Sequence, residues 1–247
     1  MDPSKPNGEL TSRSGSLIEI IPEDLSTWRK KIFLTFDIDW AHDEVLLDTY
    51  KLCFDAGVKS TFFVTHQTKA LEKLAADELV TLGIHPNFQP LLRQAPDSLS
   101  VEEEINRLME IVPTAVCSRS HGVIQGGVLL QEMSKQGILF DANDSIPFES
   151  GIKVKPFRTV YNLVKTPYVW ADEHEWAFDR RTNFVQLVED FDFLVVDFHP
   201  IHVFLNTENA DRYERTRHLH SRPAELLKHR YEGRGTRTLF KELLEIA

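Results

Sequence analysis

Short apolar segments rich in β-branched and aromatic residues alternate with segments of helical periodicity along most of this 247-residue chain. Residues 31–36 have the composition of a buried strand, and in residues 43–56 apolar positions recur at near-helical spacing before Gly57, a residue suited to end a helix. Such alternation is typical of βαβ units, which place their strands side by side in a parallel sheet. The sequence therefore predicts an α/β fold built on one parallel sheet.

The remaining pattern extends this prediction over the whole chain. We expect further strands at residues 59–64, 79–85, 114–119, 138–141 and 193–198, an extended or hairpin segment at 157–169, and helices at 69–76, 100–111, 128–136, 183–190 and 238–246. A hydrophobic content of 42% is ample for a sizeable core. We predict a flexible, Pro/Gly/Ser-rich segment at 1–16 and a single (β/α) barrel domain at 17–247.

Charge and cysteine content exclude several classes of protein. The formal charge is −10 and the longest run of Lys or Arg is the three residues Arg29–Lys31, so the chain lacks the basic stripe that binds nucleic acid. Cys53 and Cys117 lie in apolar segments without metal-ligand spacing, which favours buried thiols in a reducing compartment. Neither a signal peptide nor an apolar run long enough to span a membrane is evident, so we expect a cytoplasmic protein.

Two carboxylates stand where the first strand gives way to a loop. Asp37 and Asp39 are two positions apart, so on an extended chain their side chains point to the same face. Two like charges in a partly dry pocket raise each other's free energy unless a metal ion or an arginine offsets them. The pair therefore predicts a site that contains a cation.

Other polar residues also follow predicted strands. They are His85, Arg119, His121, Asp141, His199 and His202. In a parallel barrel all strands end at the same face, and active sites occupy that face. We therefore expect these side chains to gather with the two carboxylates at one rim.

The segments that carry these residues resemble four motifs of the metal-dependent polysaccharide deacetylases with nodulation-factor-deacetylase homology. The motifs are Thr35–Asp39, Gly83–His85, Arg119–His121 and Phe198–His199, within a resemblance that covers roughly residues 30 to 205. Phe36–Ala41, Ile84–Phe88 and Phe198–His202 are most similar to deacetylase-like proteins of O-antigen biosynthesis clusters. The resemblance implies a distorted (β/α) barrel with about seven parallel strands, in agreement with the strand pattern, and removal of acetyl groups from sugars.

The resemblance also implies a role for each residue. Asp39 and His85 would hold a divalent metal, and Asp37 would be the general base that takes a proton from the attacking water. Arg119 would keep that base ionised and oriented, and His199 would protonate the departing amine.

One position departs from the family pattern. The family usually has a second histidine four residues after His85, and this chain has Gln89 there. His121 stands where the family usually has proline and is our first candidate for the third ligand, with Asn87 or a water as alternatives. Asp and His ligands suit Zn, with Co or Ni as further choices.

Several residues near these motifs have two possible interpretations. Trp40 and Phe88 flank the metal ligands and are candidates to stack on a sugar, although aromatic side chains more often lie in a core. His202 is a candidate substrate contact or a partner that fixes the tautomer of His199. Asp172 lies near where the family carries a carboxylate that tunes its histidine, and we expect it to be a solvated loop residue.

Three functions from different classes are compatible with this pattern. The first is a metal-dependent deacetylase that acts on an N-acetylated sugar of a surface polysaccharide or of its precursor. The second is a hydrolase of another C–N bond, in a cyclic amide or a formamide. The third is a non-catalytic sugar-binding relative that has lost a metal ligand.

Overall fold

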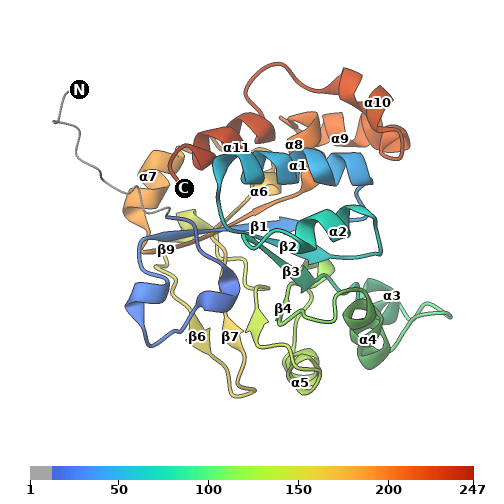
Figure 1. The fold of residues 1–247 in the computed structure, drawn as a ribbon, viewed down its shortest axis with the longest axis vertical. Coiled ribbons are helices and arrows are strands. Elements are labelled where there is room, and N and C mark those ends of the chain that lie inside the picture. The colour runs from blue at the N-terminus through green and yellow to red at the C-terminus, as the bar shows by residue number, and fades with distance from the viewer. Residues whose placement is uncertain (1–12) are drawn as a thin grey trace.

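A nine-stranded sheet forms the centre of the computed structural model, which describes residues 13–247 (Figure 1). The strands are β1 (Lys31–Asp37), β2 (Ser60–Val64), β3 (Val80–Ile84), β4 (Cys117–Ser118), β5 (Phe140–Asp141), β6 (Phe157–Arg158), β7 (Val164–Lys165), β8 (Trp170–Ala171) and β9 (Phe193–Phe198). Their order in the sheet is β6-β7-β5-β4-β3-β2-β1-β9-β8. Every recorded pairing between these strands is parallel except that of β6 with β7. The sheet is thus an open, distorted (β/α) barrel, and the predicted fold is confirmed.

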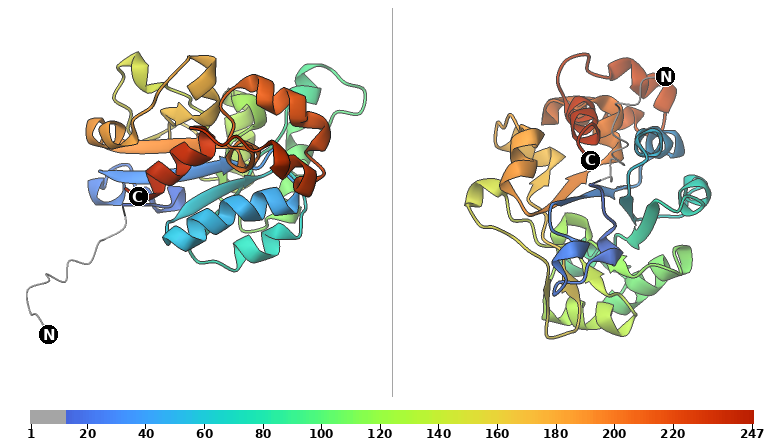
Figure 2. Two further views of the ribbon diagram at one scale, coloured as in Figure 1. Left: turned by 90° about the horizontal axis from the view of Figure 1, so that it is seen from above. Right: turned by 60° about the vertical axis from the view of Figure 1, so that its left-hand side comes forward.

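Helices cover the outside of this sheet (Figures 1 and 2). They are α1 (Asp43–Ala56), α2 (Ala70–Ala75), α3 (Gln89–Leu92), α4 (Val101–Ile111), α5 (Gly127–Lys135), α6 (Asp172–Ala177), α7 (Phe184–Asp190), α8 (Pro200–Leu205), α9 (Ala210–Thr216), α10 (Pro223–Leu226) and α11 (Thr236–Leu244). In Figure 1, α1, α8 and α11 lie together on one side of β1 and β9, and α4 and α5 lie beyond β3 and β4. Six short 3₁₀ turns, η1 to η6, lie between these elements.

Two helices begin or end through the local signals that their sequences carry. Helix α1 ends at Gly57, whose left-handed φ of 64° is free of the steric cost that other residues incur there. Helix α4 begins with a capping box in which the Ser100 side chain accepts from the Glu103 amide and the Glu103 side chain accepts from the Ser100 amide. Helix α1 has the bounds that the sequence predicts, and α4 begins one residue after the predicted start at 100 because Ser100 is its N-cap.

The central strands are buried on both faces by aromatic side chains. Phe36 of β1 stacks on Phe62 of β2 with ring centroids 4.5 Å apart, and the rings of Phe198 and Phe240 also pack against it. This packing fixes β1 between β2 and β9, with Thr35 paired to Thr61 on one side and to Asp197 on the other. The carboxyl ends of these strands therefore lie at one edge of the sheet.

The predicted flexible segment at 1–16 lies mostly outside the described residues, which begin at Arg13. The described part packs against the barrel: Ser14 forms a parallel bridge with Ile32, and the Gly15 amide donates to the Ile32 carbonyl at 2.9 Å. Ser14 and Ser16 are buried. The packed domain thus includes residues before the predicted boundary at 17, because their backbone pairs with β1 at Ile32.

A substitution at Gly83 tests how closely β3 packs against β4. A Cβ atom there would lie 2.7 Å from Cys117 Sγ, 2.8 Å from the Cys117 carbonyl and 2.8 Å from Phe63 Cδ1. We predict that Gly83→Ala lowers the free energy of unfolding by about 1–3 kcal/mol, measured by urea denaturation, because the backbone carbonyl cannot move aside cheaply. Gly126→Ala, where a Cβ meets open space, is the control and should cost less than about 1 kcal/mol. Equal losses for both variants would contradict this account.

Candidate metal centre and active site

Four strands deliver the predicted residues to one edge of the sheet. Asp37 is the last residue of β1, and His85, Arg119 and His199 directly follow β3, β4 and β9. Asp39 lies within 3.2 Å of His85 (Oδ1 to Nε2) and within 3.6 Å of His199 (Oδ2 to Nε2). Side chains drawn from the first, middle and last strands therefore lie together at one edge of the sheet, as the strand-end argument predicts.

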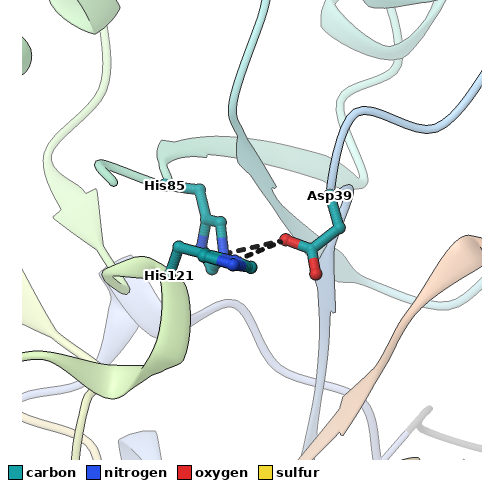
Figure 3. Close-up of side chains that lie close together, drawn as sticks. All are labelled: Asp39, His85 and His121. Atoms are coloured by element: carbon teal, nitrogen blue, oxygen red, sulfur yellow. Dashed lines mark hydrogen bonds and ion pairs between the residues drawn. The ribbon is translucent and has the colours of Figure 1, made fainter. Parts of the chain in front are cut away.

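Asp39, His85 and His121 form a compact cluster (Figure 3). Asp39 Oδ1 lies 3.2 Å from His85 Nε2 and 3.1 Å from His121 Nδ1, so two imidazole rings converge on one carboxylate oxygen. One potential ligand atom from each residue lies within 4.8 Å of the others. Two nitrogens and one oxygen form a donor set that fits Zn²⁺ and related divalent ions, with further coordination positions left for water or substrate.

The charges of the cluster favour a bound cation. Burial acts to raise the pKa of Asp39, but hydrogen bonds from His121 and His85 outweigh it and hold this pKa well below its usual range. His85 is buried, and its Nδ1 has no hydrogen-bond partner among the described residues, although Asp37 Oδ1 lies 3.6 Å away. Burial acts to lower the pKa of His85, and the two carboxylates reverse that effect and raise it. A carboxylate and two rings held in this way are pre-organised for a metal ion.

The loop after β4 places His121 in the cluster. The Asn143 side-chain oxygen accepts hydrogen bonds from the Ser120 amide (2.9 Å) and hydroxyl (2.7 Å), and the His121 amide donates to the Pro86 carbonyl at 2.9 Å. Gly122 follows with a left-handed φ of 66°, which reverses the chain directly after His121. These bonds tie the loop that carries His121 to the loop that follows His85.

A buried ion pair supports Asn143 in turn. Asp141 accepts from the Asn143 amide (3.1 Å) and side-chain nitrogen (3.0 Å), and Lys165 Nζ lies 2.6 Å from Asp141 Oδ1. Asp141, Asn143 and Lys165 are all buried. Asp141 is therefore not a metal ligand here but the support of the His121 loop, a role that the sequence did not reveal because Lys165 lies 24 positions away.

Of the alternative third ligands, Asn87 has another partner. Its side-chain oxygen accepts from the Gln89 amide at 3.1 Å, which turns the chain into α3. The Gln89 side chain lies against Gly122, since its Nε2 is 3.0 Å from where a Cβ on Gly122 would be. The position at which the family usually has its second histidine is thus next to the loop that brings His121 in.

Asp37 lies behind this cluster in a buried charge network. Arg119 Nη1 donates to Asp37 Oδ1 at 3.1 Å and also to Asp197, and Arg119 Nη2 donates to the Thr35 hydroxyl at 3.0 Å. Arg119 is fully buried, and its Nε donates to the Ala142 carbonyl. Burial raises the pKa of Asp197 to about 8 against the opposing effect of Arg119, so near neutral pH this carboxyl retains a proton. The guanidinium charge is then available to Asp37.

The carboxylate of Asp172 orients His199. Asp172 is fully buried, not the solvated loop residue that we expected. Its Oδ1 lies 2.9 Å from His199 Nδ1, and its Oδ2 accepts from the His199 amide at 2.8 Å. Burial acts to lower the pKa of His199, and Asp172 outweighs burial and raises it well above the ordinary value. The short strand β8, which the sequence did not predict by itself, brings Asp172 beside the end of β9.

The three residues proposed to contact substrate differ in their exposure. Trp40 is 49% exposed and packs edge-on against His121, with ring centroids 5.2 Å apart, so its outer face is open to a ligand. Phe88 is 2% exposed and belongs to the core, so its prediction as a sugar-stacking residue is wrong. His202 is 3% exposed, and its Nδ1 lies 3.2 Å from the Thr207 hydroxyl. It packs against His199 rather than offering a surface to substrate.

These features define a class: (β/α)-barrel hydrolases with a candidate metal centre at the strand ends. The profile of the WbmS-like polysaccharide deacetylases matches residues 34–217, and the chain belongs to this family. A solved structure from Bordetella bronchiseptica, described as a polysaccharide deacetylase (WbmS) involved in O-antigen biosynthesis, is similar over 94% of this chain and 97% of its own, with 38% identity and a TM-score of 0.91. The protein is thus a hydrolase of the polysaccharide deacetylase type.

A more distant structure shares the fold. A deacetylase structure from Mycobacterium smegmatis is 15% identical, with a TM-score of 0.50, over 74% of this chain and 82% of its own. No curated protein sequence is a significant match. Within residues 13–247, no helix is both long and apolar enough to cross a membrane.

Asp172 provides a test of how the site controls His199. We predict that Asp172→Asn, which retains one acceptor for the His199 amide, lowers kcat for deacetylation by about 10- to 100-fold. It should also lower the pKa of His199, measured by NMR titration of the metal-free protein, because the carboxylate that stabilises the imidazolium is gone. Asp211→Asn on the exposed side of α9 is the control. An unchanged titration of His199 in Asp172→Asn would contradict the assigned role.

Proposed function

We propose that this protein removes the acetyl group from an N-acetylated sugar of a surface polysaccharide, such as an O-antigen, or of a precursor of that polysaccharide. The family supports the reaction class, and the 38%-identical WbmS structure supports the O-antigen setting. The observation that carries the proposal is the convergence of His85 and His121 on one oxygen of Asp39, next to a buried carboxylate with its own arginine.

In this proposal Asp39, His85 and His121 hold a divalent metal, with Zn as the first choice and Co or Ni as alternatives. When bound, such an ion polarises an amide carbonyl and lowers the pKa of water, the two effects that hydrolysis of an unreactive amide needs. The two imidazoles and the carboxylate come from three separate strand ends, so the spacing of the ligands is set by the rigid sheet. His121 supplies the nitrogen that the family's usual second histidine would supply.

Asp37 is the proposed general base. Its Oδ1 is held by Arg119 and lies 3.6 Å from His85, so the carboxylate borders the metal cluster without belonging to it. Arg119 fixes the carboxylate in one orientation and places a positive charge beside it. Asp37 thus takes the proton of the attacking water at a fixed position beside the carbonyl carbon.

His199 is the proposed general acid on the opposite side of Asp39. Its Nδ1 is engaged by Asp172, which leaves Nε2 directed at the cavity, 3.6 Å from Asp39 Oδ2. Because Asp172 raises the pKa of His199, the ring carries a proton at neutral pH and can pass it to the departing amine. A base with its positioning arginine, together with an acid with its own carboxylate, favours catalysis over a sugar-binding role.

The proposed setting is the cytoplasm, where O-antigen precursors are built. Cys53 and Cys117 support this placement because both are free, buried thiols. Burial raises the pKa of each thiol to about 12, so neither is reactive at neutral pH.

The third metal ligand is tested by calorimetry. We predict that His121→Ala and His85→Ala each weaken Zn²⁺ binding to chelator-stripped protein by about 100-fold or more, because each removes one of three protein ligands. His218→Ala, a substitution in an exposed 3₁₀ turn, is the matched control and should bind as the unaltered protein does. Unchanged affinity in His121→Ala, with loss in His85→Ala, would mean that Asn87 or water completes the site.

The base is tested by activity. We predict that Asp37→Asn lowers acetate release from a panel of N-acetyl sugars by about 10²- to 10⁴-fold while Zn²⁺ affinity stays within a few-fold, since Asp37 takes a proton but does not hold the metal. Asp55→Asn, at an exposed ion pair with Lys51, serves as the control. If a cyclic amide or a formamide is hydrolysed and the acetamido sugars are not, the C–N hydrolase alternative replaces the deacetylase proposal.

A further inference from the structure

A hollow of about 670 Å³ lies directly beside the metal cluster. It is lined by Trp40, Ala41, His42, Asp43, His66, Gln67, Thr68, Lys69, Arg217, His220 and Ser221. The chain segment that forms one wall begins at Trp40, the residue after Asp39. A hollow of this size accommodates a ligand larger than one acetyl group.

Contacts between aromatic and imidazole rings link this hollow to His121 on one side and to His199 on the other. On one side Trp40, which lines the hollow, packs against His121 at 5.2 Å between ring centroids. On the other side the rings of His199, His202, Tyr213 and His220 follow one another with centroids 5.5, 5.0 and 4.9 Å apart. Through these ring contacts the hollow adjoins the residues that surround Asp39.

The hollow carries more positive than negative charge, in contrast to the chain's net charge of −10. Lys69 and Arg217 are its cations, and Asp43 is its one carboxylate. Within residues 13–247, the Lys69 ammonium makes no recorded hydrogen bond or ion pair, and Arg217 has only an exposed pair with Glu214 at 3.4 Å. Both cations are thus available to an anionic ligand.

Three imidazoles add polar groups of a different kind. Burial lowers the pKa of His66 and of His220, so these rings are neutral at pH 7 and act as hydrogen-bonding groups rather than charges. The His42 Nδ1 accepts from the Glu44 amide at the start of α1. Neutral rings beside two free cations are a suitable environment for phosphate oxygens.

The second hollow that Trp40 lines has the opposite character. It measures about 200 Å³ and includes Asp97, Glu104 and Arg107. Arg107 is already paired with Glu104, its Nε lying 2.8 Å from Glu104 Oε2. A phosphate is therefore favoured on the Lys69 side of Trp40, and the uncharged part of a substrate on the other.

We propose that the hollow lined by Lys69 and Arg217 binds the diphosphate of a glycosyl diphosphate, so that the substrate is an activated N-acetyl sugar rather than a finished polymer. In a 2-acetamido sugar, the carbon that carries the acetamido group is bonded to the carbon that carries the phosphate. An amide placed at Asp39 thus puts the diphosphate in the adjoining hollow. This inference rests on the deacetylase proposal, and the shared chemistry covers nucleotide-linked and lipid-linked sugars.

Kinetics of the Zn²⁺-loaded protein test the substrate class. The probes are N-acetylglucosamine, its 1-phosphate, UDP-N-acetylglucosamine and farnesyl-diphosphate-linked N-acetylglucosamine, with acetate release as the readout. We expect kcat/KM for at least one diphosphate to exceed that for the free sugar, and the better of the two diphosphates identifies the carrier. In the double variant Lys69→Ala/Arg217→Ala, the ratio of kcat/KM for the better diphosphate to kcat/KM for the free sugar should fall by about 10- to 100-fold. This fall should come from a higher KM for the diphosphate.

The control removes two charges outside the hollow, from the two helices that Lys69 and Arg217 flank. Lys73→Ala/Arg215→Ala changes α2 and α9 without altering a lining residue, so its kcat/KM ratio should equal that of the unaltered protein. Equal kcat/KM for free and diphosphate-linked sugars, or an equal loss in both double variants, would overturn the proposal.

Binding to metal-free protein separates this inference from the proposed function. Calorimetry with inorganic pyrophosphate and with UDP should detect a site that the Lys69→Ala/Arg217→Ala variant weakens about 10- to 100-fold and the control does not. If that result comes with no acetate release from any probe, the anion site stands and the deacetylase proposal fails. If acetate is released but neither pyrophosphate nor UDP binds through Lys69 and Arg217, the deacetylase proposal stands and this inference fails.

Discussion

The site depends on the hydrogen bonds and ion pairs that the buried guanidinium of Arg119 makes. It lies at the end of the two-residue strand β4 and donates to Asp37 from β1, to Asp197 from β9 and to the carbonyl of Ala142 after β5. The rings of Phe63 and Tyr168 lie 4.8 and 4.7 Å from its central carbon and close it off from water. A charge buried this completely is tolerated only while the carboxylate of Asp37 and its other hydrogen-bond partners stay in place, so the network keeps these strand ends in fixed register.

A strained backbone turn after β1 places Asp39 in the cluster that it forms with His85 and His121. Asp39 and Trp40 have left-handed φ values of 39° and 57°, a conformation that costs non-glycine residues of order 1–3 kcal/mol. The Trp40 amide donates to the Thr65 hydroxyl at 3.1 Å, which helps to hold the turn after β2. Extended geometry predicts that Asp37 and Asp39 share a face, and the turn brings Asp39 further, between the rings of His85, His121 and His199. Strain of this kind is a recurrent feature of functional sites.

Elements with strong local signals were predictable, and those made by tertiary contact were not. Helix α1 and strand β9 have their predicted bounds, and α4 is within one residue of its own, because a glycine end, a continuous apolar run and a capping box specify them locally. Strands β6 and β8 are two residues long, too short for any periodicity. Asp172 was placed in solvent because only the pairing of β8 with β9 buries it. Phe88 lies three residues after His85, a proposed metal ligand, yet its side chain packs inward, a distinction that one chain's sequence does not carry.

The proposed use of His121 as a metal ligand would link the metal site to substrate recognition. In this chain the loop after β3 has Gln89, and the loop after β4 supplies His121 in place of the proline usual in the family. His121 is also the ring against which Trp40 packs, and Trp40 separates the two hollows beside the site. A metal held by His121 would fix the His121 ring. Because Trp40 packs against this ring, the metal would also fix Trp40, the residue that would direct one end of a substrate into each hollow. Under the proposed function, the side chain that would complete the ligand set also borders the residue that lines both hollows, so metal binding and choice of substrate would both depend on His121.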